Sequence, residues 1–189
     1  MEQLRKRINF LKTFVRDRNV GALTITSRFV IQEVLKYIPV SVRTIVECGP
    51  GEGVVTRALL KRLAPEGVCL AIETNKEFVS LLHERIHDPR LQIVHGYAQD
   101  MITHADTHDI GSVDLIVASI PFSFLMPSDR LRIVGDAHKL LAPKGKLIIF
   151  NYTPLMSRPM KEVFGNASIS FELRNFFPYF IMIAEKQLK

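Results

Sequence analysis

Apolar positions recur at helical spacing near the start of the chain and change to short continuous runs from residue 43 onward. Leu4, Ile8, Leu11 and Val15 stand three or four residues apart, which predicts an amphipathic helix. A second helix is expected over residues 28–38, with Pro39 ending it.

The remainder alternates between strand-length apolar runs and helical segments. The predicted strands are TIVECG (44–49), VCLAIE (68–73), LQIVHG (91–96), VDLIVASI (113–120), KLIIFNY (146–152), SISFELR (168–174) and YFIMIAE (179–185). Helices are predicted over 54–63, over 76–87 and from Ser128 onward, and loops over the His- and Asp-rich stretch 104–109 and over 153–159. Short strands that are apolar on both faces are typical of an α/β fold with a mostly parallel sheet between helices.

The length and composition suit one structural domain. The chain has 189 residues, 47% of them hydrophobic, which is enough for a full core. We expect an N-terminal helical cap over residues 1–40 and a core over residues 41–189. The net charge is +6, and residues 1–20 carry +4 of it, because they hold six Lys or Arg and two acids. This basic helix is expected either to bind a partner or to be a solvated helix face.

Cysteine usage and hydropathy indicate a cytoplasmic protein. Cys48 and Cys69 lie on separate predicted strands and do not make a disulfide framework, which favours a reducing compartment. The N-terminus has no apolar signal-peptide region. The apolar run 115–126 contains Pro121 and is shorter than the roughly 20 residues that span a bilayer. We therefore expect a soluble or membrane-peripheral protein.

Glycines at alternate positions follow the first predicted strand. Gly49, Gly51 and Gly53 form its turn into a helix, where free backbone N–H groups and a close ligand approach are available. Ligands of open α/β sheets lie beyond the carboxyl ends of such strands. Glu47 before the turn suits a positively charged ligand, and Glu73 at the end of the next strand suits the two hydroxyls of a ribose. Together they predict a nucleoside ligand without a pyrophosphate.

The segment Glu47-Cys48-Gly49-Pro50-Gly51-Glu52-Gly53 resembles the E/D-x-G-x-G-x-G motif of the class I methyltransferases. The alternatives are a plain strand–turn–helix junction and an NAD site, for which the third glycine is misplaced. The resemblance implies a Rossmann-like fold, a seven-stranded sheet with an antiparallel final strand, and S-adenosylmethionine as cofactor, with S-adenosylhomocysteine as product. It implies a cofactor site made of Thr26, Ser27, Glu47, Cys48, Gly49, Pro50, Gly51, Gly53, Glu73, Thr74, Ala98, Asp100, Met101 and Ser119.

Two positions depart from the pattern of that family. Tyr97 stands where many members have an acid that contacts adenine, and Asp100 either replaces that acid or caps a helix. The segment ASIPFSF (118–124) follows the fourth strand, where adenine-N6 methyltransferases carry Asn-Pro-Pro-Tyr or a similar motif. Here Ser119 replaces the Asn, which weakens a nucleic-acid interpretation. The candidate catalytic residues are Ser119, Pro121, Phe122 and Tyr152.

The N-terminal region resembles that of the bacterial phospholipid N-methyltransferases, which are close to the ribosomal RNA adenine dimethylases. The similarity lies in a Phe-rich basic helix and in a loop that reads VGALTITSR (20–28) here. It implies a phospholipid amine substrate such as phosphatidylethanolamine, an anionic membrane partner, and peripheral location on the inner membrane face. The candidate substrate or membrane contacts are Arg5, Lys6, Arg7, Lys12 and Arg158. The alternatives are an RNA adenine or small-molecule N-methyltransferase and a non-catalytic cofactor-, RNA- or lipid-binding module.

Aromatic faces are expected to hold the methylammonium product by cation–π contact. The candidates are Phe122, Phe124 and Tyr152, of which Phe124 is more readily explained as core. The segment HERIH (83–87) matches a zinc-protease pattern, but no third ligand has suitable spacing, and no metal is predicted. The oligomeric state is not determined by these patterns.

Overall fold

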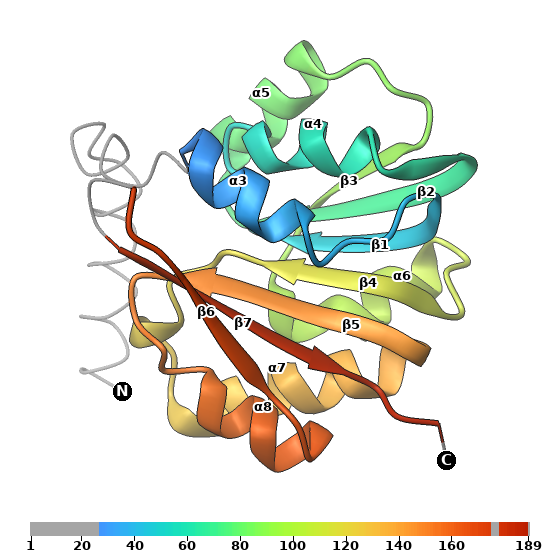
Figure 1. The fold of residues 1–189 in the computed structure, drawn as a ribbon. Helices are drawn as coiled ribbons and strands as arrows, with labels where there is room; N and C mark the ends of the chain where they lie inside the picture. Colours follow the sequence, from blue (N-terminus) through green and yellow to red (C-terminus); the bar gives the residue numbers. More distant parts are fainter. Residues whose placement is uncertain (1–26, 175–177, 189) are drawn as a thin grey trace, which may run out of the picture.

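The protein is described in a computed structural model over residues 27–174 and 178–188. Within these residues, seven strands form one sheet in the order β3-β2-β1-β4-β5-β7-β6 (Figure 1). The strands are β1 Val42–Cys48, β2 Leu63–Glu73, β3 Leu91–His95, β4 Val113–Ala118, β5 Leu141–Asn151, β6 Ser168–Glu172 and β7 Tyr179–Glu185. Strands β1 to β5 pair in parallel, and β7 runs antiparallel to both β5 and β6. The expected mostly parallel sheet with an antiparallel final strand is confirmed.

Helices cover both faces of the sheet (Figure 1). The helices are α3 Arg28–Leu35, α4 Val54–Leu60, α5 Lys76–Arg85, α6 Met101–Thr107, α7 Pro127–Leu140 and α8 Ser157–Phe164. Short 3-10 turns cover Ala98–Asp100 (η1) and Phe122–Phe124 (η2). Helices α3 and α4 bury their apolar side chains in one core layer, and α6, α7 and α8 bury theirs in the other. The alternation of short apolar strands with helices therefore predicted the layers correctly.

Two segments that the sequence predicts as loops contain helices. In α6, Met101 and Ala105 stand one turn apart and are buried, although polar side chains surround them in sequence. In α8, Met160 and Phe164 repeat the same spacing, and Pro159 falls in the first turn, where a missing N–H is tolerated. The two short amphipathic helices were not predicted because their segments are rich in polar residues or contain a proline. Their few apolar side chains become buried only against the sheet.

The lengths of several elements also differ from expectation. Strands β2 and β5 each run over 11 residues, because residues 63–67 and 141–145 join them across irregular register shifts. Helix α3 ends at Leu35, α4 at Leu60 and α5 at Arg85, each before its predicted end. None of these differences moves the carboxyl ends of β1, β2, β4 and β5, where the predicted site residues lie.

Candidate active site

The glycine turn after β1 has the backbone conformation that its sequence predicts. Gly49, Gly51 and Gly53 have φ angles of 80°, 55° and 78°, in the left-handed region that favours glycine. A Cβ atom at Gly49 would stand 2.7 Å from the Ile120 side chain and 2.9 Å from the Ser119 carbonyl oxygen. The turn after β1 therefore packs directly on the loop after β4. A side chain at Gly51 would meet nothing within 4 Å, so this part of the turn is open to a ligand.

Glu73, in the neighbouring strand β2, stabilises this turn by hydrogen bonds. Its carboxylate, at the end of β2, accepts hydrogen bonds from the backbone N–H groups of Gly51 at 3.0 Å and Asn75 at 2.9 Å. The Glu73 side chain is buried, whereas the adjacent Thr74 is exposed. A carboxylate in this place is preorganised beside the glycine turn and suits the hydroxyl groups of a sugar.

Glu47 is a buried acid whose charge has little compensation. It lies in β1, 3% exposed, and neither its Oε2 atom nor the nearby Thr56 Oγ1 atom has a hydrogen-bond partner in the described part of the chain. Burial raises the pKa of Glu47 to about 7; the Thr56 hydroxyl opposes this rise, and the charge of Glu73 adds to it. An unsatisfied buried carboxylate beside an open glycine turn fits a ligand with an ammonium group.

The edge beyond β3 combines buried and exposed positions. Ala98 and Met101 are buried, whereas Tyr97 is 62% exposed. Asp100 occupies the N-cap position of α6 without a side-chain capping bond, and its carboxylate lies 3.9 Å from Arg132. Asp100 thus occupies the cap position without a capping bond of its side chain, and its replacement of the acid missing at Tyr97 stays a prediction.

His104 was predicted to lie in a solvated loop, but its ring packs against Gly96. A side chain at Gly96 would collide with that ring, and His104 Nε2 is buried with no hydrogen-bond partner among the described residues. The motif at the end of β3 therefore needs a glycine for packing. In the sequence, a glycine directly after a predicted strand is the feature that could have indicated this close packing.

The loop after β4 is held by side chains from two other elements. Asn151 Nδ2, at the end of β5, donates to the Ile120 carbonyl oxygen at 2.9 Å. Arg130, in α7, donates from Nε to the Phe122 carbonyl oxygen at 2.8 Å and from a terminal nitrogen to the Ser123 carbonyl oxygen at 3.2 Å. The sequence analysis missed both residues. Asn151 could have been found because it ends an apolar strand at the ligand edge, whereas Arg130 has no local signal.

The four candidate catalytic residues are not all at the surface of this loop. Ser119 is half-buried and Pro121 is exposed, but the Phe122 ring is 0% exposed and belongs to the core under α6, α7 and α8. The expectation that Phe122 presents its ring to a substrate is therefore wrong for this structure, because the ring packs into the apolar core. Phe124, expected to be core, is half-buried instead.

Tyr152 follows β5 at the same edge of the sheet. It is half-buried, and its ring lies 4.3 Å from the ring of Tyr179, centroid to centroid. The Tyr152 backbone N–H donates to Asn151 Oδ1 at 2.8 Å. Asn151 therefore connects the Tyr152 backbone with the loop after β4.

The other predicted residues lie on or next to α3, α5 and α8 or outside the described residues. Ser27 caps α3, accepting a hydrogen bond from the Val30 N–H at 3.5 Å. Thr26, Arg5, Lys6, Arg7 and Lys12 lie outside the described residues. Arg158 is exposed on α8, and His83 and His87 of the HERIH segment are exposed. Within residues 27–174 and 178–188, no group of side chains has the composition of a metal site, and no helix is long and apolar enough to cross a bilayer.

The chain is similar to known methyltransferases along most of its length. The methyltransferase domain family matches residues 45–145, more than half of the chain. An ornithine lipid N-methyltransferase from Singulisphaera acidiphila is 25% identical over 173 residues, which cover 88% of both chains. Ribosomal RNA small subunit methyltransferase A from Methylococcus capsulatus is 33% identical over 71% of this chain but only 49% of its own length. The chain thus spans about half of that RNA-modifying relative.

The fold is shared with solved enzymes at low sequence identity. An O-methyltransferase from Bacillus cereus, solved in complex with S-adenosylhomocysteine, superposes with a TM-score of 0.65 at 18% identity, over 90% of this chain and 96% of its own. Its likeness shows the fold alone, whereas the domain match also covers the glycine motif and Glu73. The expectation of an enzyme, rather than a non-catalytic module, is therefore confirmed. The chain belongs to the methyltransferase domain family and is a class I S-adenosylmethionine-dependent methyltransferase.

Proposed function

We propose that this enzyme methylates the amine headgroup of a phospholipid such as phosphatidylethanolamine. The observation that carries the proposal, for a lipid amine in general, is the similarity to an ornithine lipid N-methyltransferase over 88% of both chains. RNA methyltransferase A relatives match only part of their own length. Ser119, which stands in place of the Asn that binds an adenine amino group, favours the lipid as well, because a hydroxyl does not reproduce a planar amide.

The cofactor site in this proposal lies on the turn after β1. The backbone of Gly49 to Gly53 approaches the methionine part of the cofactor, Glu47 lies near its ammonium, and Glu73 takes the ribose hydroxyls. Ala98, Asp100 and Met101 border the adenine. Cys48, Pro50 and Thr74 complete the turns around it, and Thr26 and Ser27 are proposed to approach it from the N-terminal side.

The chemistry in this proposal is a direct displacement by nitrogen. When bound, S-adenosylmethionine supplies an electrophilic methyl group. The unprotonated amine forms a C–N bond as the S–CH₃ bond breaks, and the nitrogen then loses a proton to solvent. The chain positions the amine: Ser119 and Pro121 line the loop, while Phe124 and Tyr152 offer aromatic faces to the cationic product.

The proposed location is the cytoplasmic face of the inner membrane, held peripherally. The basic residues Arg5, Lys6, Arg7 and Lys12 of the predicted N-terminal helix suit anionic headgroups. An RNA adenine N-methyltransferase is the second candidate, and the 33% identity to ribosomal RNA small subunit methyltransferase A favours it.

Transfer of labelled methyl groups tests the substrate class. The protein is incubated with S-adenosylmethionine labelled in its methyl group and with a cell extract, which is then separated into lipid, RNA and small-amine fractions. We expect label in methylated derivatives of phosphatidylethanolamine, and less label with Gly51→Trp, which blocks the open turn. Label confined to RNA would overturn the lipid proposal in favour of the second candidate.

A further inference from the structure

Edge strand β6 exposes a row of apolar side chains. Ile169, Phe171 and Leu173 are 42%, 58% and 73% exposed. Ile169 and Phe171 pair across the strand with Met182 and Phe180 of β7, so they lie on the sheet face that α8 covers. Met182 is fully buried there, and the rings of Phe171 and Phe180 are in edge-to-face contact at 5.2 Å. Among the residues that the structure describes, helix α8 thus covers β7 but not these side chains of β6.

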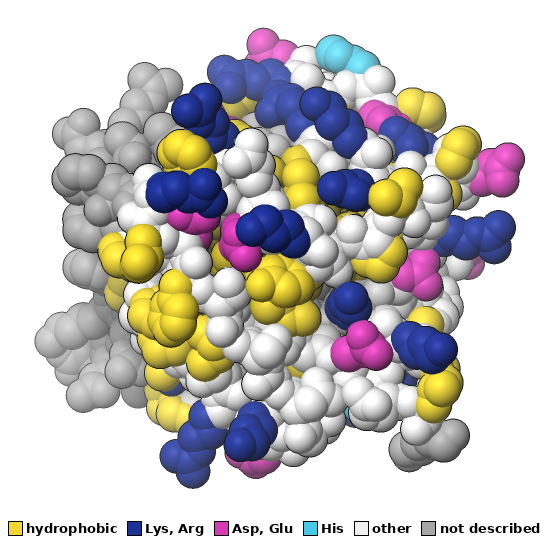
Figure 2. Space-filling model, viewed as in Figure 1, with side chains coloured by type: hydrophobic (Ala, Val, Ile, Leu, Met, Phe, Trp, Pro, Cys, Tyr) yellow, Lys and Arg dark blue, Asp and Glu magenta, His cyan; other side chains and the backbone are white. Residues whose placement is uncertain are grey.

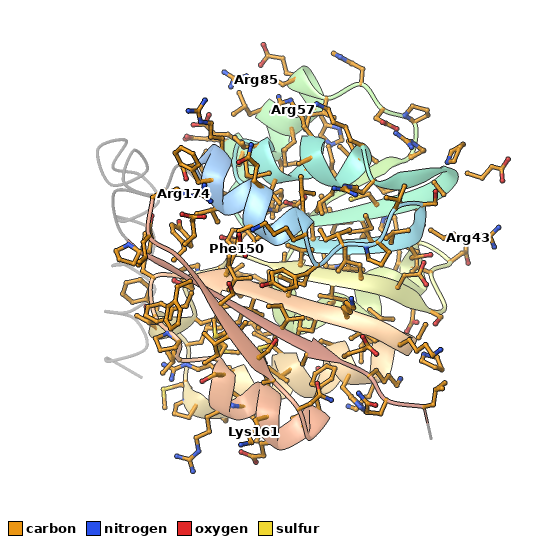
Figure 3. The ribbon with its side chains drawn as sticks, in the orientation of Figure 1. Arg43, Arg57, Arg85, Phe150, Lys161 and Arg174 are labelled. Atoms are coloured by element: carbon orange, nitrogen blue, oxygen red, sulfur yellow. The ribbon has the colours of Figure 1, made fainter. Side chains whose placement is uncertain are left out.

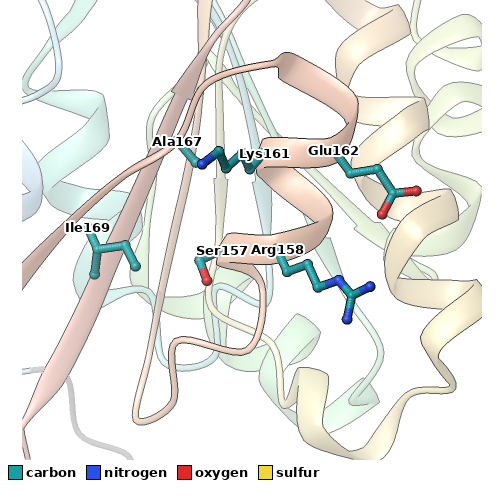
Figure 4. A pocket seen from close by; sticks show the side chains of 6 residues that line it. All are labelled: Ser157, Arg158, Lys161, Glu162, Ala167 and Ile169. Carbon is teal, nitrogen blue, oxygen red and sulfur yellow. The ribbon is translucent and has the colours of Figure 1, made fainter.

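Uncompensated cations stand beside this row. Arg158 and Lys161, both exposed on α8, form no hydrogen bond or ion pair through their side chains with any other residue that the structure describes. They line a shallow cavity of about 550 Å³ with Ser157, Glu162, Ala167 and Ile169 (Figure 4). In that view the Lys161 side chain reaches toward Ala167, at the start of β6. The Lys161 cation therefore lies next to the apolar side chains of β6, whereas Arg158 and Glu162 extend from the other side of α8 (Figure 4).

The surface lies next to the ligand edge of the sheet. Strand β6 runs in the direction of β5, because both are antiparallel to β7, so its exposed end approaches the carboxyl ends of the parallel strands. Phe171 pairs with Phe180, Phe180 pairs with Asn151, and Asn151 holds the loop after β4. Two strand spacings separate Phe171 from Asn151, about 10 Å. Figure 2 shows hydrophobic side chains gathered over this end of β6, with Lys and Arg below them over α8.

From this arrangement we infer that β6 and α8 form a docking surface for an anionic phospholipid bilayer. We call Arg158, Lys161, Ile169, Phe171 and Leu173 the β6–α8 surface. Aliphatic and aromatic side chains beside unpaired cations suit the boundary between acyl chains and anionic headgroups. RNA would use the cations but not Ile169 or Leu173. The inference rests on the proposed lipid substrate, which it deepens by naming the face that the enzyme turns toward the membrane.

Sedimentation with vesicles tests the surface on the full chain. The vesicles contain phosphatidylcholine alone or with phosphatidylglycerol. We expect Arg158→Gln with Lys161→Gln to weaken binding to the anionic vesicles about fivefold for each charge removed. Phe171→Ser with Leu173→Ser should weaken binding to both kinds of vesicle. Calorimetry with S-adenosylmethionine should give unchanged affinity for these variants, because the side chains are exposed and none of them belongs to the cofactor turn.

Matched variants on other parts of the surface serve as controls. Arg43 lies at the opposite end of the sheet from Arg174 (Figure 3), and Arg43→Gln with Lys61→Gln removes two exposed cations there. Leu188→Ser removes a side chain that is 64% exposed. Equal losses in the control and test variants would overturn the inference, since net charge or general apolarity would then explain binding.

Two further results separate this inference from the proposed function. Unchanged vesicle binding in both test variants, together with methylation of phosphatidylethanolamine, would overturn the surface and leave the lipid substrate standing. Loss of vesicle binding in the test variants alone, together with label only in RNA, would support the surface and overturn the substrate. A change of oligomeric state in the test variants with unchanged vesicle binding would show that a second copy covers β6, and would overturn the inference.

Discussion

The negative charge of Glu47 is unfavourable in the empty site, because the carboxyl group is buried. A carboxyl group that is fully buried beside Thr56 and Glu73 ionises only near neutral pH, with a pKa of about 7. In water the same group has an ordinary pKa of 4.5, so the folded chain resists the charged form. A cationic ligand beside Glu47 would compensate that charge. Glu47 therefore lowers the stability of the empty enzyme, and a cationic ligand that binds beside it would recover this free energy as affinity.

The pH dependence of unfolding tests this account of Glu47. Because the folded-state pKa lies above the unfolded-state value, Glu47 costs little stability below pH 4.5. The cost grows between pH 4.5 and about 7 and stays constant at higher pH. We expect Glu47→Gln to leave the free energy of unfolding nearly unchanged at pH 4.5 and to raise it by up to about 3 kcal/mol at pH 8. Denaturant titrations at both pH values measure this difference. If the variant were destabilised equally at both pH values, ionisation of Glu47 would not lower the free energy of unfolding, and this account would be wrong.

The loop after β4 is an element whose shape depends on its neighbours. Its backbone forms short-range turns, such as Phe124 N–H to the Pro121 carbonyl oxygen. In addition, the carbonyl groups of Ile120, Phe122 and Ser123 accept bonds from the side chains of Asn151 and Arg130. Three carbonyl groups of this loop are therefore bonded to side chains from β5 and α7. Such bonds hold the acceptor side of the site in one geometry, on which displacement reactions depend strongly.

Replacement of Arg130 should separate alignment from cofactor binding. We expect Arg130→Met to lower kcat for methyl transfer roughly tenfold to a hundredfold, because the Phe122 and Ser123 carbonyl groups lose the bonds that tie the loop to α7. The Kd for S-adenosylmethionine should stay within about twofold of the parent. Lys139→Gln, an exposed change on the same helix, serves as the control. Equal losses of kcat and cofactor affinity would mean that Arg130 supports the whole fold instead of the loop.

The whole molecule protects its two thiols in the centre of the sheet. Cys48 in β1 and Cys69 in β2 are both 0% exposed and free, which confirms that they form no disulfide. Burial is the main cause that raises the pKa of Cys48 to about 12 and that of Cys69 well above its ordinary value. Reaction of either thiol therefore requires the central strands to separate.

Thiol labelling should report on unfolding of the entire sheet. We expect both cysteines to react with a thiol reagent at one common slow rate, because β1 and β2 are hydrogen-bonded neighbours in the core. S-adenosylmethionine at 100 times its Kd should slow labelling about a hundredfold, since binding stabilises the folded state by about 2.7 kcal/mol. Mass spectrometry of the labelled chain measures both rates. Fast labelling of Cys48 alone would mean that the turn after β1 opens locally.

Local sequence patterns were sufficient for much of this protein. Seven apolar runs predicted the seven described strands, and the spacing of Glu47, Gly49, Gly51 and Gly53 predicted a tight ligand turn, because strand burial and left-handed backbone angles depend on nearby residues. The same patterns left out α6 and α8, whose few apolar side chains become significant only against the sheet. They also left out Asn151 and Arg130 as partners of the loop after β4.

The remaining features depend on contacts between residues far apart in the chain. The inward turn of Phe122, the packing of His104 against Gly96 and the bare face of β6 each follow from which elements become neighbours. No local pattern encodes such neighbours, because burial and partner choice arise when strands and helices assemble around one core. The glycine motif and the alternation of elements were enough to predict the fold and the cofactor. The tertiary structure alone decided which side chains of the described residues are buried and which stay exposed.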